Sequence, residues 1–152
     1  MTITERITRH IGQLPTPPKP IAMFVPIMQS GNTLYVSGQG PNIENELQYS
    51  GKLGAEYDIE MGYDAAKLCG VNILAHLKAY LGDLDRVEKI LKATVYVAST
   101  TDFYDQPMVA NGFSELMVKV FEDKGCHARC AVGLAVLPGN IPVEIDVVLQ
   151  VR

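Results

Sequence analysis

Charged side chains interrupt the last two apolar stretches of this 152-residue chain. Arg129 lies within the run 128–134, and Glu144 and Asp146 alternate with apolar residues in the run 143–151. A charged side chain in an apolar strand must be paired, solvated or used in function, because burying an unpaired ion is costly. We therefore expect the function of the protein to depend on Arg129.

Strand alternation predicts which residues share a face with these charges. In the final strand the odd-numbered residues 143 to 151 are all apolar and should face the core, so Glu144 and Asp146 should point the other way. In the preceding strand we assign the larger apolar set to the core: Ala128, Cys130, Val132 and Leu134. The opposite set should then lie on the open face with the two acids: His127, Arg129, Ala131, Gly133 and Ala135. Such a face could be a ligand groove or a subunit interface.

Apolar periodicity and turn residues predict the remaining elements. Four prolines within residues 13–20 exclude a helix and a central strand there, so we expect an extended N-terminal arm over residues 1–20. Helical and alternating patterns predict, in order, strands at 23–28 and 33–37, a helix at 59–81, a strand at 87–99, a helix at 105–124, and strands at 128–136 and 141–151. Residues 42–57 show no period and are interpreted as a surface loop. The order predicts one α+β domain over residues 1–152, with a mixed sheet and two helices on one face.

Composition and charge exclude several classes of protein. No apolar run approaches the roughly 20 residues that span a bilayer, and the N-terminus lacks the features of a secretory signal, so we expect a cytoplasmic protein. The net charge of -4 and the scattered lysines and arginines argue against nucleic acid as a partner.

The chain has three cysteines, Cys69, Cys126 and Cys130. They are too few, and odd in number, for a disulfide framework, so free thiols are expected. Cys126, His127 and Cys130 do not predict a metal site, because strand alternation separates the cysteines from the histidine and a fourth ligand is missing. The sequence also contains no phosphate loop or nucleophile elbow. We expect no metal and no cofactor.

Several motifs occur in an order that resembles the Rid family, also called YjgF-like proteins. They are Leu34-Tyr35-Val36-Ser37-Gly38-Gln39, Gly82-Asp83-Leu84, Ala128-Arg129 with Leu137-Pro138, and Val143-Glu144-Ile145. The resemblance runs from residue 20 to the C-terminus. It implies a chorismate-mutase-like fold, assembled as a homotrimer with the open sheet faces inside and three clefts between subunits. It also implies hydrolysis of reactive enamines and imines, such as 2-aminoacrylate, to 2-oxo acids and ammonia.

The same resemblance implies roles for individual residues. Arg129 matches the family arginine that holds the substrate carboxylate with two parallel hydrogen bonds, and Glu144 matches the acid near the attacking water. Ser37, Gly38 and Asn111 fall at cleft positions.

Other positions depart from the deaminase branch of the family. Phe24 stands where that branch usually has a tyrosine, and Ala131 where it commonly has a cysteine, so a hydroxyl and a thiol are missing. His127 could reach a ligand or a proton from the predicted face of Arg129, or it could be a solvated surface residue. Residues 47–54, the proline-rich arm and His127 resemble a longer subgroup whose chemistry the motifs do not assign.

Structural alternatives exist for each site residue. Arg129 could form a salt bridge with Glu144 or Asp146 in a trimer core, and an adjacent arginine would lower the pKa of Glu144 and make it a poor base. Ser37 could satisfy backbone groups at a strand end, and Asn111 could cap a helix or bridge subunits.

Three functions compete. The first is the hydrolytic deaminase, and the second is a trimer that binds a small carboxylate or metabolite without turnover, as a sensor or partner protein. Endoribonuclease activity, attached to some relatives, is disfavoured by the acidic charge balance.

Overall fold

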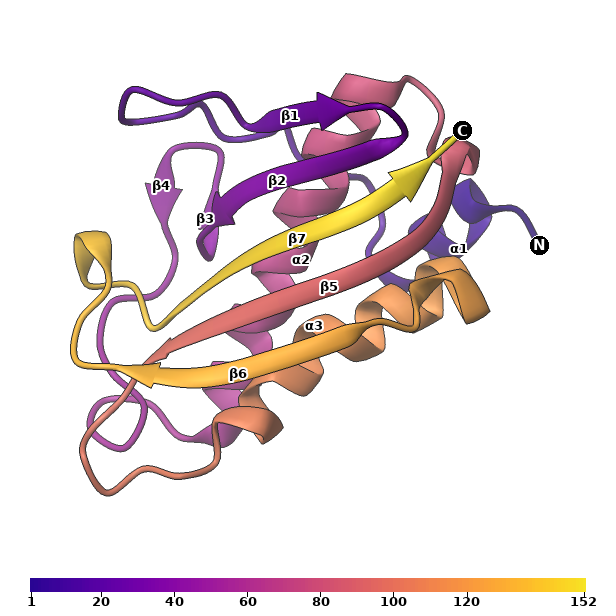
Figure 1. The fold of residues 1–152 in the computed structure, drawn as a ribbon. Helices are drawn as coiled ribbons and strands as arrows, with labels where there is room; N and C mark the ends of the chain where they lie inside the picture. Colours follow the sequence, from indigo (N-terminus) through magenta and orange to yellow (C-terminus); the bar gives the residue numbers. More distant parts are fainter.

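The chain folds into a five-stranded sheet with helices packed on one face, as Figure 1 shows. A computed structural model describes all of residues 1–152. The main elements are α1 (Ile3–His10), β1 (Ile27–Ser30), β2 (Thr33–Gln39), β3 (Asn42–Ile43), β4 (Glu46–Leu47), α2 (Ile59–Leu81), β5 (Val87–Ala98), α3 (Gln106–Phe121), β6 (Ala128–Leu134) and β7 (Val143–Val151). None of the helices is both long and apolar enough to cross a membrane.

The sheet is mixed, with the strand order β1-β2-β7-β5-β6. The pair β5 and β6 is parallel, whereas β1 with β2, β2 with β7 and β7 with β5 are antiparallel. Helices α2 and α3 lie side by side behind the sheet in Figure 1. The predicted α+β class and mixed sheet are confirmed, but three helices form rather than two.

The core lies between α2, α3 and the sheet. The odd-numbered residues of β7 from Val143 to Val151 are almost completely buried there, as their alternation predicted. Helix α2 begins where the Asp58 side chain accepts a hydrogen bond from the Met61 N–H at 2.9 Å, and it ends at Gly82, whose φ is 78°. The predicted helix at 59–81 is therefore confirmed at both ends.

Residues 3–10 are helical, so the expected extended arm over residues 1–20 is wrong in its first half. Thr2 and Glu5 form a capping box, in which each side chain accepts a hydrogen bond from the other residue's backbone N–H. Ile3 and Ile7, one turn apart, are buried in the core, and the Arg6 Nε donates to the Val120 carbonyl at 2.7 Å. The proline-rich residues 13–20 do lack helix and strand.

The loop 42–57 contains the small β3–β4 hairpin and is fastened to the turn before β7. The Gly51 N–H donates to the Asn140 carbonyl at 2.9 Å, and the Asn140 Nδ2 donates to Ser50 Oγ at 3.2 Å. The Leu53 N–H donates to the Ala98 carbonyl at 3.0 Å. This loop therefore braces the turn at residues 138–140, which leads into the strand that carries Glu144.

Strand β6 presents the opposite face from the predicted one. Its register pairs Arg129 with Ala93 and Ala131 with Val95, and the two β5 residues are completely buried on the helix side. Because directly paired residues share a face, Arg129 and Ala131 point toward α3. Cys130 is exposed on the open face, so its expected place in the core is wrong.

Candidate functional site

The guanidinium of Arg129 is held by three neutral acceptors on α3. Its Nη1 donates to Asn111 Oδ1 at 2.9 Å and to Ser114 Oγ at 3.1 Å, and its Nη2 donates to the Pro107 carbonyl at 3.3 Å. No carboxylate lies within ion-pairing distance, since the salt bridges of the chain are Arg6 with Glu122 and Arg152 with Glu88. The expected alternative, an ion pair with Glu144 or Asp146, does not form within one chain.

These three bonds leave part of the guanidinium unused. A guanidinium carries five N–H donors and no acceptor, so the Nε–H and one Nη2–H remain without a protein partner. Nε and Nη2 form one edge of the planar group, the kind of edge that matches the two oxygens of a carboxylate. Arg129 is thus fixed in place but still positively charged and partly open.

His127 joins this network through Ser114. Ser114 Oγ lies 2.9 Å from His127 Nε2, and His127 Nδ1 lies 2.7 Å from the Gly125 carbonyl. The Phe113 ring packs edge-on against the imidazole, with ring centroids 5.5 Å apart. His127 therefore packs against α3 in a bonded position, rather than on the open face of the sheet.

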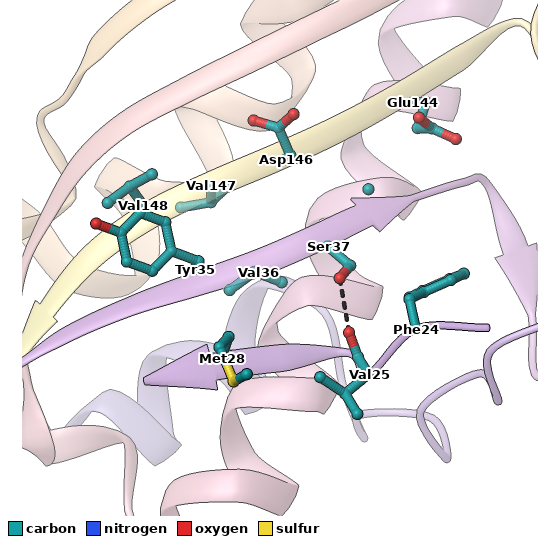
Figure 2. Close-up of a pocket in the computed structure, with 11 residues that line it drawn as sticks. Phe24, Val25, Met28, Tyr35, Val36, Ser37, Glu144, Asp146, Val147 and Val148 are labelled. Carbon is teal, nitrogen blue, oxygen red and sulfur yellow. Dashed lines mark hydrogen bonds between the residues drawn. The ribbon is translucent and has the colours of Figure 1, made fainter. Parts of the chain in front are cut away.

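On the open face, residues of β2 and β7 line a groove with a volume of about 730 Å³. Figure 2 shows Tyr35, Ser37, Asp146 and Glu144 along it, with Phe24 at the end nearest Glu144. Seven of the eleven lining residues are hydrophobic, so the two acids are the charged groups of a mainly apolar surface.

Ser37 and Gly38 shape the end of this groove. Ser37 Oγ donates to the Val25 carbonyl at 2.7 Å, the dashed bond in Figure 2, and the Ser37 N–H donates to the Pro26 carbonyl at 2.9 Å. Both bonds tie the segment that carries Phe24 to β2, so the structural alternative for Ser37 is realised. A methyl group built on Gly38 would lie 2.8 Å from Glu144 Oε2, so the carboxylate rests directly over the glycine.

Burial, and then the negative charge of Asp146, raise the pKa of Glu144 above its ordinary value. The expected lowering by an adjacent arginine does not occur in the chain, because Arg129 is on the other side of the sheet. Asp146 is itself engaged, since the Tyr96 hydroxyl donates to its Oδ2 at 2.8 Å and this bond raises the pKa of Tyr96. A carboxylate whose pKa is raised is a stronger base toward water than an ordinary glutamate.

The expected site residues fall into two groups. Phe24, Ser37, Gly38 and Glu144 line the open-face groove together. The second group lies between β6 and α3 and comprises Arg129, Asn111, His127 and the half-buried Ala131. Within one chain the sheet separates the two groups, so they do not form one pocket.

Ser114 belongs to the Arg129 group, although the sequence patterns did not identify it as a site residue. Asn111 and Ser114 are three residues apart and therefore share a face of α3. A polar pair on an otherwise apolar helix face was the signal that could have identified it. No cluster of three or more His, Cys, Asp or Glu side chains is arranged to hold a metal ion.

Comparison with protein families assigns the chain. The family described as "YjgF/chorismate_mutase-like, putative endoribonuclease" matches residues 7–148. The chain belongs to this family. Rid proteins, among them a 2-iminobutanoate/2-iminopropanoate deaminase, are also members of it.

Two similar proteins carry names without an activity. Protein TCP17 of Trypanosoma cruzi is 41% identical over 141 residues, which cover 92% of this chain and 88% of that protein. The crystal structure of Atu1372 from Agrobacterium tumefaciens, described as of unknown function, is 41% identical and covers 99% of this chain and 92% of its own, with a TM-score of 0.92.

One more distant relative has a name that states a reaction, and one more distant structure was solved with a ligand. A 2-iminobutanoate/2-iminopropanoate deaminase of Dermatophagoides farinae is 26% identical over 95% of this chain and 98% of its own length. The structure of TdcF from E. coli with bound serine is 23% identical, covers 90% of this chain and 94% of its own, and has a TM-score of 0.60.

Proposed function

We propose that this YjgF-family protein hydrolyses small imines or enamines that carry a carboxylate, in clefts between the subunits of a homotrimer. The observation that carries the proposal is the guanidinium of Arg129, ordered by three neutral acceptors and without a carboxylate partner. An arginine held in this way is preorganised for an anionic ligand. The named deaminase among the relatives supports the choice of an imino acid as that ligand.

In the proposed reaction, an enamine such as 2-aminoacrylate first tautomerises to 2-iminopropanoate. Its carboxylate binds the free Nε and Nη2 edge of Arg129, which orients the imine carbon. Glu144, a strengthened base, accepts a proton from the water that adds to this carbon, and this proton passes to the imine nitrogen to give a neutral carbinolamine. Glu144 then takes the proton of the new hydroxyl and that proton is delivered to the nitrogen, so the C–N bond breaks as the C=O bond forms, and a 2-oxo acid and ammonia leave. Water is the sole co-reactant.

A second copy of the chain is needed because Arg129 and Glu144 lie on opposite sides of the sheet. The open face has no helix over it, and large apolar side chains are exposed there: Met28, Tyr35 and Val132. Packing this face against other copies would bury these groups. In such an assembly the Arg129 side of one subunit could meet the groove of the next. A mass in solution close to three chains is the expected result of sedimentation analysis.

The test is release of ammonia from 2-aminoacrylate generated in situ. The wild type should accelerate release, Arg129→Ala should lose on the order of a hundredfold because two charge-assisted hydrogen bonds disappear, and Arg129→Lys should recover only part of this loss. The matched control is Arg9→Ala, which removes an exposed arginine at the end of α1 and should act like the wild type. No acceleration by the wild type, or an unchanged Arg129→Ala rate, would refute the deaminase.

A binding protein without turnover is the second candidate. It is favoured by the groove end at Phe24, which offers a ring that is 45% exposed and no hydroxyl, and by Ala131, which offers no thiol. Thermal stabilisation by pyruvate or 2-oxobutanoate that depends on Arg129, without ammonia release, is the result expected of this candidate. Absence of stabilisation by any small carboxylate would exclude it.

A further inference from the structure

The hydrogen bonds around Ser114 form a relay that runs from Arg129 through Ser114 and His127 to the Gly125 carbonyl. Arg129 has no acceptor, so Ser114 Oγ must accept from its Nη1. The hydroxyl hydrogen of Ser114 is then free to donate to His127 Nε2, 2.9 Å away. The Gly125 carbonyl can only accept, so His127 Nδ1, 2.7 Å away, carries a proton, and in this tautomer Nε2 is free to accept from Ser114.

The groups of this hydrogen-bonded relay are held in place by residues outside the site. The Gly125 carbonyl belongs to the short helical turn 122–125, where Gly125 is packed so tightly that a methyl group on it would lie 2.2 Å from the Met117 carbonyl. The ring of His127 is also held by Phe113, which is completely buried. The rigid core is thus connected to Arg129 through two side chains that donate hydrogen bonds in sequence.

We infer that Ser114 and His127 are positioning residues for Arg129, which set the plane of its guanidinium so that the Nε and Nη2 edge faces a ligand carboxylate. Without this relay, Asn111 and the Pro107 carbonyl still hold Nη1 and Nη2 at one bond each. The guanidinium can then rotate about that pair of contacts, and carboxylate binding weakens because the orientation must be restored on binding. His127 therefore acts through Ser114 and does not contact the ligand.

This inference rests on the proposed carboxylate site, but it can be tested without a ligand. ¹⁵N relaxation of the Arg129 Nε–H reports the order of the guanidinium directly. Order should be high in the wild type, lost in Ser114→Ala and kept in Ser114→Thr, which retains the hydroxyl. The ¹⁵N shifts of His127 should show a protonated Nδ1 and an unprotonated Nε2.

Two amide substitutions of His127 distinguish the roles of its two ring nitrogens. The amide of His127→Gln reaches the position of Nε2 and can accept from Ser114, whereas that of His127→Asn reaches only the position of Nδ1. Guanidinium order should therefore survive His127→Gln and fall in His127→Asn. The control is His10→Asn, at the C-terminal end of α1, whose side chain takes no part in these hydrogen bonds and which should change nothing.

Binding and kinetics provide the second readout. Ser114→Ala and His127→Asn should each raise the KM for the imine, or the Kd for pyruvate, by about tenfold with kcat nearly unchanged, and the double variant should be no worse than either. Unchanged Arg129 order in Ser114→Ala, a protonated Nε2 in the wild type, or multiplied effects in the double variant would overturn the inference. If Arg129 order responds as expected but the wild type neither binds carboxylates nor releases ammonia, the proposed function fails and the positioning role stands.

Discussion

The two groups of site residues differ in how the fold has prepared them. On the α3 side of the sheet, a cation is surrounded by neutral hydrogen-bond acceptors, and its bonding partners are fixed in turn by the core. On the open face, an acid rests over a glycine in a mainly apolar groove, with a second acid nearby and no cation. Each half leaves its charge uncompensated in the isolated chain. In the proposed cleft between subunits, a ligand carboxylate and a neighbouring chain would complete the two halves.

The largest expected effect is the recovery of ammonia release when two inactive variants are mixed. It tests whether the two groups of site residues come together from different chains. If every cleft takes Arg129 from one subunit and Glu144 from the next, Arg129→Ala and Glu144→Gln chains should each be nearly inactive alone. After the chains are unfolded and refolded together, random cyclic trimers should contain about a quarter intact clefts and regain about that share of wild-type ammonia release. Mixed trimers that remain inactive would place both residues in a cleft from a single chain, or in none.

Loss of the acid alone should be the next largest effect. Glu144→Gln removes the base and should lower kcat by about a hundredfold, with a smaller change in KM. In the wild type, the acidic limb of the kcat/KM profile should lie above pH 4.5, because burial and Asp146 raise the pKa of Glu144.

Asp146→Asn should move that limb to lower pH without abolishing activity, since it removes one of the two causes of the raised pKa. The measurement is the pH dependence of ammonia release. A limb that does not respond to Asp146→Asn would mean that another group controls it.

The packing of Glu144 on Gly38 predicts an intermediate effect. Gly38→Ala places a methyl group 2.8 Å from Glu144 Oε2, so the carboxylate must swing aside, and kcat should fall by about tenfold. In the Glu144→Gln background the same substitution should add little, because the displaced group no longer acts as a base. Equal losses in both backgrounds would indicate general damage to β2 rather than displacement of the acid.

The smallest expected effect concerns stability. The pKa of Glu144 is raised in the folded protein. The contribution of Glu144 to the free energy of unfolding is therefore fully present below its ordinary pKa of 4.5, and it is lost as the pH rises through the pKa of the folded state. Glu144→Gln, which stays neutral, should therefore raise Tm by about 1–2 °C at pH 7 and have almost no effect at pH 4. Calorimetry at the two pH values measures this, and a lower Tm at pH 7 would contradict it.

Patterns of apolar residues in the sequence predicted the fold well for helices and strands that bury a single face. The period of α2 and the alternation of β7 both identified core residues that are now seen to be buried. Helix α1 was missed because the prolines at 15–20 dominated the interpretation of the arm. The capping-box pair Thr2 and Glu5, together with Ile3 and Ile7 on one face, was the local signal for it.

The face of β6 could not be settled in this way. Alternation determines which residues share a face, but it does not say which face is inside. Strand β6 is at the sheet edge, where Val132 is 41% exposed although it is larger than Ala131, so size was a poor guide to burial. The partners of Arg129, at positions 107, 111 and 114, lie 15 to 22 residues earlier in the chain. Their contact with the arginine depends on how α3 packs on the sheet.

The contact between Gly38 and Glu144 also has a consequence for how YjgF-family sequences diverge. A carboxylate can rest over position 38 only while that position has no side chain, so the two positions should change together among relatives. Members that replace the glycine should have lost the acid or moved it, whatever residue they keep at the position of Arg129. If Glu144 is the base of the proposed reaction, the pair is a marker, readable from sequence alone, that separates relatives able to activate water from those that have kept only the capacity to bind an anion.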